Sequence, residues 1–385
     1  MRLKRLGLIA SILLLLPLYG CWDRRELNDR LFELGSGVDL IEDGKILMVG
    51  QFMIPAKSGD TGSGEKQSYF IETGTGKNAF DGLFDMQLKL SRRITRAHRH
   101  NIYIGEKMAM SGISNFLDSV TRDPDSRIRS DIWVVKGGTA LEFMQMTFPL
   151  EKMPAIALSK SRQIIGKKIG NSVLEILIAE NVEGNGPTLP TVEVFYDRKL
   201  RKKTFHVYGR AILNRKQQLA GYYDAMESAY RLWVIGETKR IPITVQMANG
   251  QGTFSVEVQR ATCQIRTEAK DGQVNINVEL KGGAIVQESN TSWDLRQTNR
   301  LQTYEAELNR HVEAAVSSII QKAQKEFKVD VFLFGRTLSR QHPEQWTALN
   351  TRWEQAFSGA KVSVHSHVKI KQIGLQGPPP NHEEP

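Results

Sequence analysis

Hydrophobic residues between positions 37 and 146 change repeatedly from two-residue alternation to helical spacing. Residues 37–54 predict a β-hairpin, because apolar residues alternate on both sides of a turn that contains Asp43 and Gly44. Further strands are expected at residues 69–72, 101–104 and 132–135, and helices at residues 80–94, 108–120 and 140–146. Since strands and helices alternate, this half of the chain predicts a mixed α/β or α+β fold.

The second half is dominated by alternation with a period of two. Residues 204–213 and 241–287 follow this pattern, and Asp271-Gly272 marks a hairpin turn. We therefore expect an antiparallel sheet with one buried and one wet face. A long helix from about Asn299 to Phe327 should pack against it, and its apolar stripe contains the following residues: Leu301, Tyr304, Leu308, Val312, Val316, Ile319, Ile320, Ala323 and Phe327.

These patterns predict an α+β (mixed α/β) protein with more than one domain. Residues 179–190, which contain Asn185-Gly186-Pro187, have the composition of a linker. We expect an N-terminal region at residues 21–190, which may itself divide into two mixed α/β domains, and a C-terminal sheet-and-helix domain at residues 198–375. The proline-rich tail, residues 376–385, is expected to be disordered.

The first twenty residues have the pattern of an export signal. Three basic residues precede an apolar run from Leu6 to Leu18 that lacks any ionisable side chain. This run is shorter than the roughly 20 apolar residues of a membrane-spanning helix, and its flanks are typical of a secretory signal peptide. Leu18-Tyr19-Gly20-Cys21 resembles a lipobox, so we expect cleavage after residue 20 and lipid attachment to Cys21 as N-palmitoyl and S-diacylglycerol cysteine. A plain signal peptide, cleaved near Gly20, is the alternative.

Composition indicates a globular, basic protein. Of its 385 residues, 40% are hydrophobic and 24% charged, and Cys263 is the one cysteine besides Cys21. The formal net charge is +10, and removal of residues 1–20, which carry three basic and no acidic residues, leaves +7. Because the basic residues are scattered, we expect no nucleic-acid partner. Proximity to anionic lipid head groups is our preferred interpretation, and a simply solvated surface is the alternative.

Motifs that carry chemistry are weak in this sequence. Gly59–Lys66 superficially resembles a phosphate-binding loop, but Glu65 stands where lysine belongs. Gly74–Ala79 resembles a dinucleotide fingerprint without its acidic ribose partner. The pairs His98/His100 and His365/His367 could each offer two imidazoles to a metal, yet neither has a third ligand at an obvious spacing. We therefore expect no catalytic residue, no metal and no cofactor.

The segment from Gly20 to Asp29, which includes Trp22, Asp23 and Glu26, is distinctive. It resembles the mature N-terminus of the Ger(x)C lipoproteins, the C subunits of spore nutrient germinant receptors in endospore-forming bacteria. Four further segments match in order: His100–Ala109; Asp123-Pro124-Asp125-Ser126-Arg127, continuing to Gly137; Leu219–Asp224 with Glu227 and Trp233; and Phe334-Gly335-Arg336, Trp346, Trp353 and Phe357, ending near Gly374. One departure is the more apolar run Val331–Gly335.

The resemblance implies a non-enzymatic subunit, lipid-anchored on the outer face of the inner spore membrane. It would act with a large membrane-embedded A subunit and a transporter-like B subunit, which together sense nutrients and trigger germination. Whether this subunit contacts the nutrient itself stays open. So does the role of Trp22, Asp23 and Glu26, which could equally tie the anchor segment to its domain. Two other classes are alternatives: a solute-binding lipoprotein of a transport system, and an envelope hydrolase or metalloenzyme that uses the histidine pairs.

Overall fold

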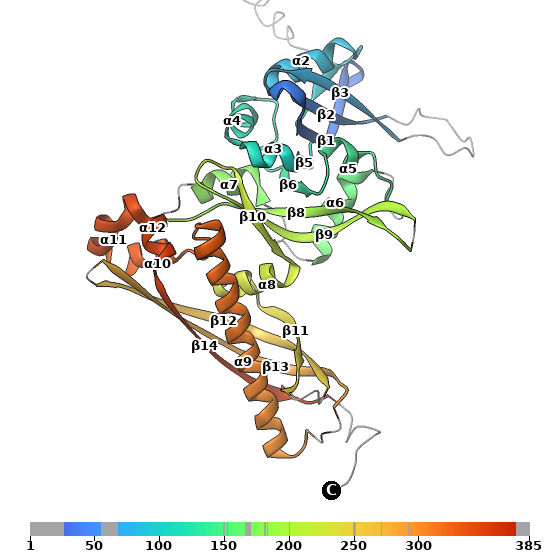
Figure 1. The fold of residues 1–385 in the computed structure, drawn as a ribbon. Coiled ribbons are helices and arrows are strands. Elements are labelled where there is room, and N and C mark those ends of the chain that lie inside the picture. The colour runs from blue at the N-terminus through green and yellow to red at the C-terminus, as the bar shows by residue number, and fades with distance from the viewer. Residues whose placement is uncertain are drawn as a thin grey trace, which may run out of the picture.

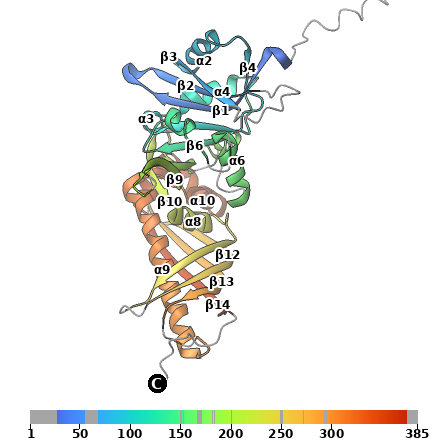
Figure 2. The same ribbon diagram turned by 90° about the vertical axis from the view of Figure 1, so that its right-hand side faces the viewer.

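The computed structural model describes residues 27–54, 68–148, 151, 153–165, 171–180, 182, 184–199, 201–248, 252–270, 272–291, 293 and 295–374. In that part the molecule is elongated, with a large sheet and its helices at one end and a smaller sheet with a long helix at the other (Figures 1 and 2). The described chain begins at the first end and stops, after the last strand, at the second (Figure 1). None of the described helices combines the length and the apolar character that crossing a membrane requires.

The larger sheet has ten strands and is mixed parallel and antiparallel. Its central order is β10-β9-β8-β6-β5-β1-β2-β3, while β4 pairs with β1 and β7 with β6. The strands are β1 (Arg30–Leu40), β2 (Ile46–Met53), β3 (Tyr69–Gly76), β4 (Arg93–Thr95), β5 (Asn101–Gly105), β6 (Asp131–Lys136), β7 (Asn171–Ser172), β8 (Thr188–Asp197), β9 (Lys202–Leu213) and β10 (Leu219–Asp224). A short 3-10 turn, η2 (Leu27–Asp29), precedes β1, and η3 (Glu42–Gly44) joins β1 to β2.

Helices cover both faces of this sheet. One apolar core lies under α2 (Ala79–Leu88), α3 (Glu106–Ser111), α4 (Ser114–Arg122) and α7 (Val173–Glu180). The other lies under α5 (Ala140–Met144) and α6 (Pro154–Ile165). Because parallel central strands are buried on both faces, β5 and β6 consist almost wholly of buried residues.

The smaller sheet has the order β11-β12-β13-β14. Its strands are β11 (Arg240–Gln246), β12 (Thr253–Lys270), β13 (Gln273–Ser289) and β14 (Lys361–Gln372). Its core lies between the sheet and a set of helices: α8 (Ala225–Val234), α9 (Thr298–Lys322), the π-helical turn η5 (Ala323–Phe327), α10 (Phe334–Gln341), α11 (Pro343–Leu349), η6 (Asn350–Arg352) and α12 (Trp353–Ser358).

Most elements expected from the sequence are confirmed. β1 and β2 form the antiparallel hairpin, with Asp43 and Gly44 both at positive φ in its turn. β12 and β13 form the second hairpin, and the long helix exists as α9 continued by η5, with its stripe buried except for the half-buried Leu301. The mixed α/β class and the presence of two sheets agree with the expectation.

Two local expectations are wrong, and one expected helix has an unusual orientation. Residues 108–120 form two helices instead of one, because Gly112 at φ 109° interrupts them. Ile94 lies in β4 and not in the preceding helix. The expected helix is present as α2, where Phe80, Phe84 and Leu88 point to solvent, while Ala79, Gly82 and Met86 are buried.

The strand pairing of the second half also differs from the expectation. Residues 204–213 lie in β9, which pairs with β8 and β10 in the larger sheet and not with residues 241–287. The smaller sheet is not wholly antiparallel, since β14 joins β13 in parallel after the intervening helices. A division into regions 21–190 and 198–375 stays a prediction; β8 runs through residue 190 and β9 continues the same sheet. The loop at 57–68 and the tail at 376–385 fall almost entirely outside the described residues.

Helix side chains occupy the hydrogen-bonding groups of several strand edges. On β14, the N–H groups of Ser366, Val368 and Ile370 donate to Glu313, Asn309 and Glu305 of α9, each over 2.8 Å. On β12, the N–H groups of Thr267 and Ala269 donate to Gln341 and Gln345, also over 2.8 Å. In the larger sheet, Asp85 and Lys89 of α2 bond Thr75 N and Thr73 O of β3, and Lys322 bonds Tyr222 O of β10. We call these contacts edge caps.

Candidate functional site

A cavity of about 640 Å³ opens between α2, α4 and the chain that follows α4. This volume lies within the range of small-molecule pockets, roughly 300–1,000 Å³. The lining combines an apolar part with a charged part. Its residues are Ile46, Met48, Lys77, Asn78, Ala79, Phe80, Leu83, Arg96, Arg99, Asn115, Phe116, Asp118, Ser119, Val120, Arg122, Asp123, Pro124 and Ser126.

The Asp123-Pro124 segment forms a turn at the rim of this cavity. Asp123 Oδ1 accepts the N–H of Asp125 over 3.0 Å, and the Asp123 carbonyl accepts the N–H of Ser126 over 3.0 Å. Such a turn is typical of an aspartate followed by proline. The other carboxylate oxygen of Asp123 lies 2.9 Å from Arg96 Nη2. The turn therefore brings the Asp123 carboxylate and the Ser126 hydroxyl to two arginines.

Arg99 lies at the back of the cavity and is 3% exposed. Its guanidinium donates to the hydroxyl oxygens of Ser126 at 2.6 Å, Ser36 at 3.2 Å and Ser130 at 3.4 Å. Because a guanidinium presents its donors in a fixed plane, it connects β1 to the turn and to the start of β6. Arg99 thus sets the position of the groups around the cavity.

Burial is the largest influence on the pKa values of Arg99 and of the carboxyl group behind it. Glu33 on β1 is fully buried and accepts a hydrogen bond from the Ser36 hydroxyl. Burial raises the pKa of Glu33, although Arg99 and Arg96 act in the opposite direction. Burial also lowers the pKa of Arg99 to about 10, with Glu33 opposing, so the guanidinium stays protonated at neutral pH. Among the described residues, Glu33 Oε2 and Arg96 Nε have no hydrogen-bond partner.

The cavity lining carries a net positive charge. It contains four basic residues, Lys77, Arg96, Arg99 and Arg122, and two acidic ones, so that 4 − 2 gives +2. Both acids are paired: Asp118 lies 2.7 Å from Arg122 Nε, and Asp123 contacts Arg96. With apolar side chains opposite, this arrangement suits a small solute that carries a carboxylate and an apolar group.

The tryptophans singled out in the C-terminal half have a different environment. Trp353 is buried, its Nε1 donates to Asp330 Oδ2 over 3.1 Å, and its ring centroid lies 5.4 Å from that of Trp346. Asp330 also accepts the N–H groups of Phe332 at 2.9 Å and Gly335 at 2.8 Å. Its carbonyl accepts the N–H of Gly186 over 2.7 Å. Trp353 and Asp330 therefore fasten the segment before β8 to the C-terminal helices.

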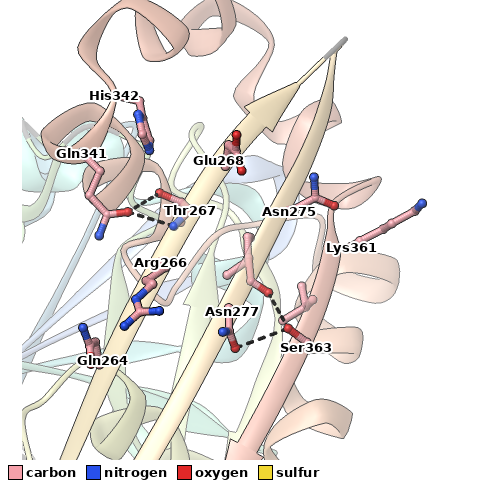
Figure 3. Close-up of a pocket in the computed structure, with 12 residues that line it drawn as sticks. Gln264, Arg266, Thr267, Glu268, Asn275, Asn277, Gln341, His342, Lys361 and Ser363 are labelled. Carbon is pink, nitrogen blue, oxygen red and sulfur yellow. Dashed lines mark hydrogen bonds between the residues drawn. The ribbon is translucent and has the colours of Figure 1, made fainter.

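A second hollow, of about 950 Å³, lies along the adjoining ends of β12, β13 and β14 (Figure 3). Polar side chains such as Glu268, Asn277 and Lys361 project around it from the strands. Gln341 reaches in from α10 and bonds Thr267 as an edge cap (Figure 3). The hollow lies on the wet side of a sheet, where Arg266, Glu268 and Lys361 are exposed.

The predicted site residues fall in three places. Cys21, Trp22, Asp23 and Glu26 lie outside the described residues. Asp123 and Pro124 line the cavity, whereas the exposed Arg127 contributes its carbonyl to Ser130. Trp346 and Trp353 lie in the C-terminal core.

The histidine pairs do not gain further ligands in the described part of the chain. No group of three or more His, Cys, Asp or Glu residues there is arranged to hold a metal ion. His98 packs edge-on against Phe32, with ring centroids 5.2 Å apart. The pKa of His100 is lowered by burial and by the nearby positive charge of Arg127. His365 and His367 lie on the exposed side of β14.

Sequence reasoning missed Glu33, Arg96 and Arg99, which organise the cavity. Arg96 and Arg99 stand three residues apart before a buried strand, a spacing that resembles surface charge. Glu33 interrupts the apolar pattern of β1, and a charged residue within a buried strand is the one signal that could have been used.

Two family models match the chain. The spore germination protein N-terminal domain covers residues 23–194, and the spore germination B3/GerAC-like C-terminal domain covers residues 208–374. Sequence relatives extend over nearly the same length. The putative spore germination protein YfkR of Bacillus subtilis (strain 168) is 24% identical over 95% of this chain and 96% of its own. Spore germination protein KC of the same organism is 23% identical over 99% of this chain and 98% of its own.

The fold is shared with a solved structure. A crystal structure described as that of the GerBC protein aligns with a TM-score of 0.59 at 18% identity. The alignment covers 88% of this chain and 97% of the other. Both family domains match the chain in order, and relatives align with it from end to end. The chain therefore belongs to the Ger(x)C family of spore germination proteins.

Proposed function

We propose that this protein is the C subunit of a spore nutrient germinant receptor. It is anchored through lipid on Cys21 to the outer face of the inner spore membrane and acts with membrane-embedded A and B subunits. The observation that supports this most is the match of both family domains in order, along with full-length relatives named for spore germination.

We propose further that the subunit is not an enzyme. The buried charged groups of the cavity are engaged in holding the fold: Arg99 bonds three serine hydroxyls, and Asp123 closes a turn and pairs with Arg96. Cations and hydroxyls arranged in this way bind neighbouring groups and hold them in position. Such a role suits a subunit that works through contact with other proteins.

Deletion of the gene tests the assignment. Spores without it should fail to germinate with the nutrient of their receptor, yet should respond normally to exogenous dipicolinate, which acts after the receptor. Reintroduction of the intact gene should restore the nutrient response. A normal nutrient response in the deletion strain, with any paralogous receptor also removed, would contradict the proposal.

The anchor has its own test. A Cys21→Ala chain should fold normally but lose membrane attachment and nutrient-triggered germination through mislocalisation. Retained attachment together with full activity would contradict lipid anchoring at Cys21 while leaving the receptor assignment untouched.

A solute-binding lipoprotein is the second candidate, and the basic and apolar cavity favours it. Binding of a carboxylate solute at a hundredfold its Kd would stabilise the protein by about 2.7 kcal/mol. A thermal-shift series with amino acids and sugars measures this. The matched control is Lys77→Ala, which should abolish any shift caused by binding in the cavity. Absence of a shift for every solute would exclude this candidate for the solutes tried.

A further inference from the structure

The outward stripe of α2 contains the three most exposed large apolar side chains among the described residues. Phe80, Phe84 and Leu88 follow at spacings of four residues, so they lie on one face of the helix. Their exposed fractions are 75%, 59% and 71%. Three large apolar side chains in one continuous row indicate a contact surface, whereas scattered exposed residues would not.

The packing of α2 fixes this orientation. Gly82 faces β3, where a Cβ on Gly74 would lie 2.0 Å from the Gly82 carbonyl oxygen. Met86 fills the sheet side of the helix and is fully buried. A third side of α2 is held by the Asp85 edge cap on Thr75. Rotation of the helix to bury the stripe would break all of these contacts, so the stripe stays available for contact with another molecule or surface.

The position of α2 in the molecule suggests what covers it. α2 lies at the end of the elongated molecule where the described chain begins, opposite the end that holds the smaller sheet (Figures 1 and 2). Six peptide units separate Cys21 from Leu27, a reach of at most about 20 Å. An anchor at Cys21 would therefore hold this end of the molecule close to the bilayer.

Charge favours lipid over a neutral apolar partner. Between residues 77 and 93 the chain carries four basic residues, Lys77, Lys89, Arg92 and Arg93, against Asp81 and Asp85, a balance of +2. Lys77, Arg92 and Arg93 are exposed just before and just after the helix. Aromatic and leucine side chains on one face, with basic residues at its ends, are typical of helices that lie in the interface of anionic membranes.

We propose that α2 is a membrane-contact helix, whose stripe of Phe80, Phe84 and Leu88 enters the head-group region of the bilayer beside the anchor. This inference rests on the proposed lipid anchor at Cys21. The helix would add a second contact with the membrane. The long axis of the molecule would then point away from the bilayer, and the smaller sheet would lie farthest from it.

Fluorescence from the full-length lipidated chain, reconstituted alone into phosphatidylglycerol-containing vesicles, tests the proposal. A Phe84→Cys chain in a Cys263→Ser background is labelled with an environment-sensitive dye, and Gln302→Cys, near the start of α9 at the far end, is the matched position. We expect emission from position 84 at shorter wavelength and severalfold stronger quenching by nitroxide lipids than at position 302. Equal, water-like signals at both positions would overturn the proposal.

Serine substitutions identify the stripe as the cause. Phe80→Ser with Leu88→Ser should return the label at position 84 to a water-like signal, because none of the three apolar side chains of the stripe is then left to enter the interface. Ile178→Ser with Tyr196→Ser, which removes apolar residues of similar exposure elsewhere, should leave the signal unchanged. A label at position 84 that responds in spore membranes but not in pure lipid vesicles would overturn the lipid assignment and indicate a protein partner.

The anchor is checked separately in the same preparation. The Cys263→Ser chain without an added cysteine takes up no dye when Cys21 is lipidated and takes up one equivalent when it is free. Labelling there, or loss of the chain from the vesicles, would show that the anchor has failed. If the anchor is retained and position 84 still gives a water-like signal, the role of α2 is refuted while the proposed anchor is not affected.

Discussion

At the residue scale, Asp330 is the side chain whose loss should cost most outside the apolar cores. Its two oxygens accept the N–H groups of Phe332, Gly335 and Trp353 Nε1, and none of these donors has access to bulk water. Asp330→Ala should lower the free energy of unfolding by about 2–4 kcal/mol, because buried donors are left without acceptors. Denaturant unfolding followed by tryptophan fluorescence measures this. Exposed Glu344→Ala is the control, and an equal effect of the two would contradict the interpretation.

Glu33 should make stability depend on pH. Its pKa in the folded protein lies above the ordinary value of 4.5, so the folded state binds more protons than the unfolded state between these two values. Its contribution is therefore present below about pH 4.5 and is lost as the pH rises through the interval, by about 1.4 kcal/mol for each pH unit. Relative to Glu33→Gln, the wild-type protein should lose stability with rising pH. Urea unfolding of both proteins from pH 4 to 8 checks this, and a difference that grows in the opposite direction would refute it.

The structural roles of the residues around the cavity and of Asp330 could be predicted from the sequence only in small part. The turn at Asp123-Pro124 follows from local chemistry, and it is found as a turn. Leu333, in contrast, adopts φ 63° at the start of α10, which its residue type does not announce. Glu33 and Arg99 interact electrostatically only because sheet pairing brings β1 and the chain before β5 together, although the two residues are 66 positions apart.

At the element scale, Asn309 should be the most important edge cap. Its Oδ1 accepts Val368 N at 2.8 Å and Ser366 Oγ at 2.7 Å, and its Nδ2 donates to Val368 O at 3.0 Å. Asn309→Ala should destabilise the protein by about 1–3 kcal/mol and speed amide exchange at Val368. Exposed Gln302→Ala on the same helix is the control. Unchanged exchange along β14 in the Asn309 variant would contradict this role.

Element types were predictable because apolar spacing is a local property. The stripe of α9 and the two hairpins follow directly from it. The same spacing located α2 but could not tell which side of that helix is covered, since small residues such as Gly82 pack closely against Gly74. Periodicity also gave no warning that polar residues of α9 and α10 bond strand edges.

At the scale of the whole molecule, the two sheets should unfold together. β9 contributes Leu213 to the core of the larger sheet and Ile212 to the core of the smaller one. Tyr223 of β10 is buried, and its hydroxyl donates to the Ile319 carbonyl of α9 over 2.5 Å. We expect a single unfolding transition, reported equally by amide exchange in β5 and in β13. Two separated transitions would contradict this coupling.

Tyr223→Phe should weaken that coupling. Removal of the hydroxyl leaves the Ile319 carbonyl without this donor, so we expect a loss of about 1 kcal/mol and a broader transition. Exposed Tyr196→Phe is the matched control.

The sequence suggested two regions but placed residues 204–213 in the wrong sheet, because alternation shows that a segment is a strand and not which strand it pairs with.

The edge caps also affect how copies of this chain can associate with one another. Proteins attached to one face of a membrane meet in two dimensions, repeatedly and in similar orientation, and an open strand is a template for the same strand of a neighbour. Carboxylates, amides and lysines from α2, α9, α10 and α11 already occupy several of these templates, and Pro242 removes one donor from β11. Any clustering of anchored copies should therefore be reversible association through side chains, without the zipping of backbones that would make a cluster permanent.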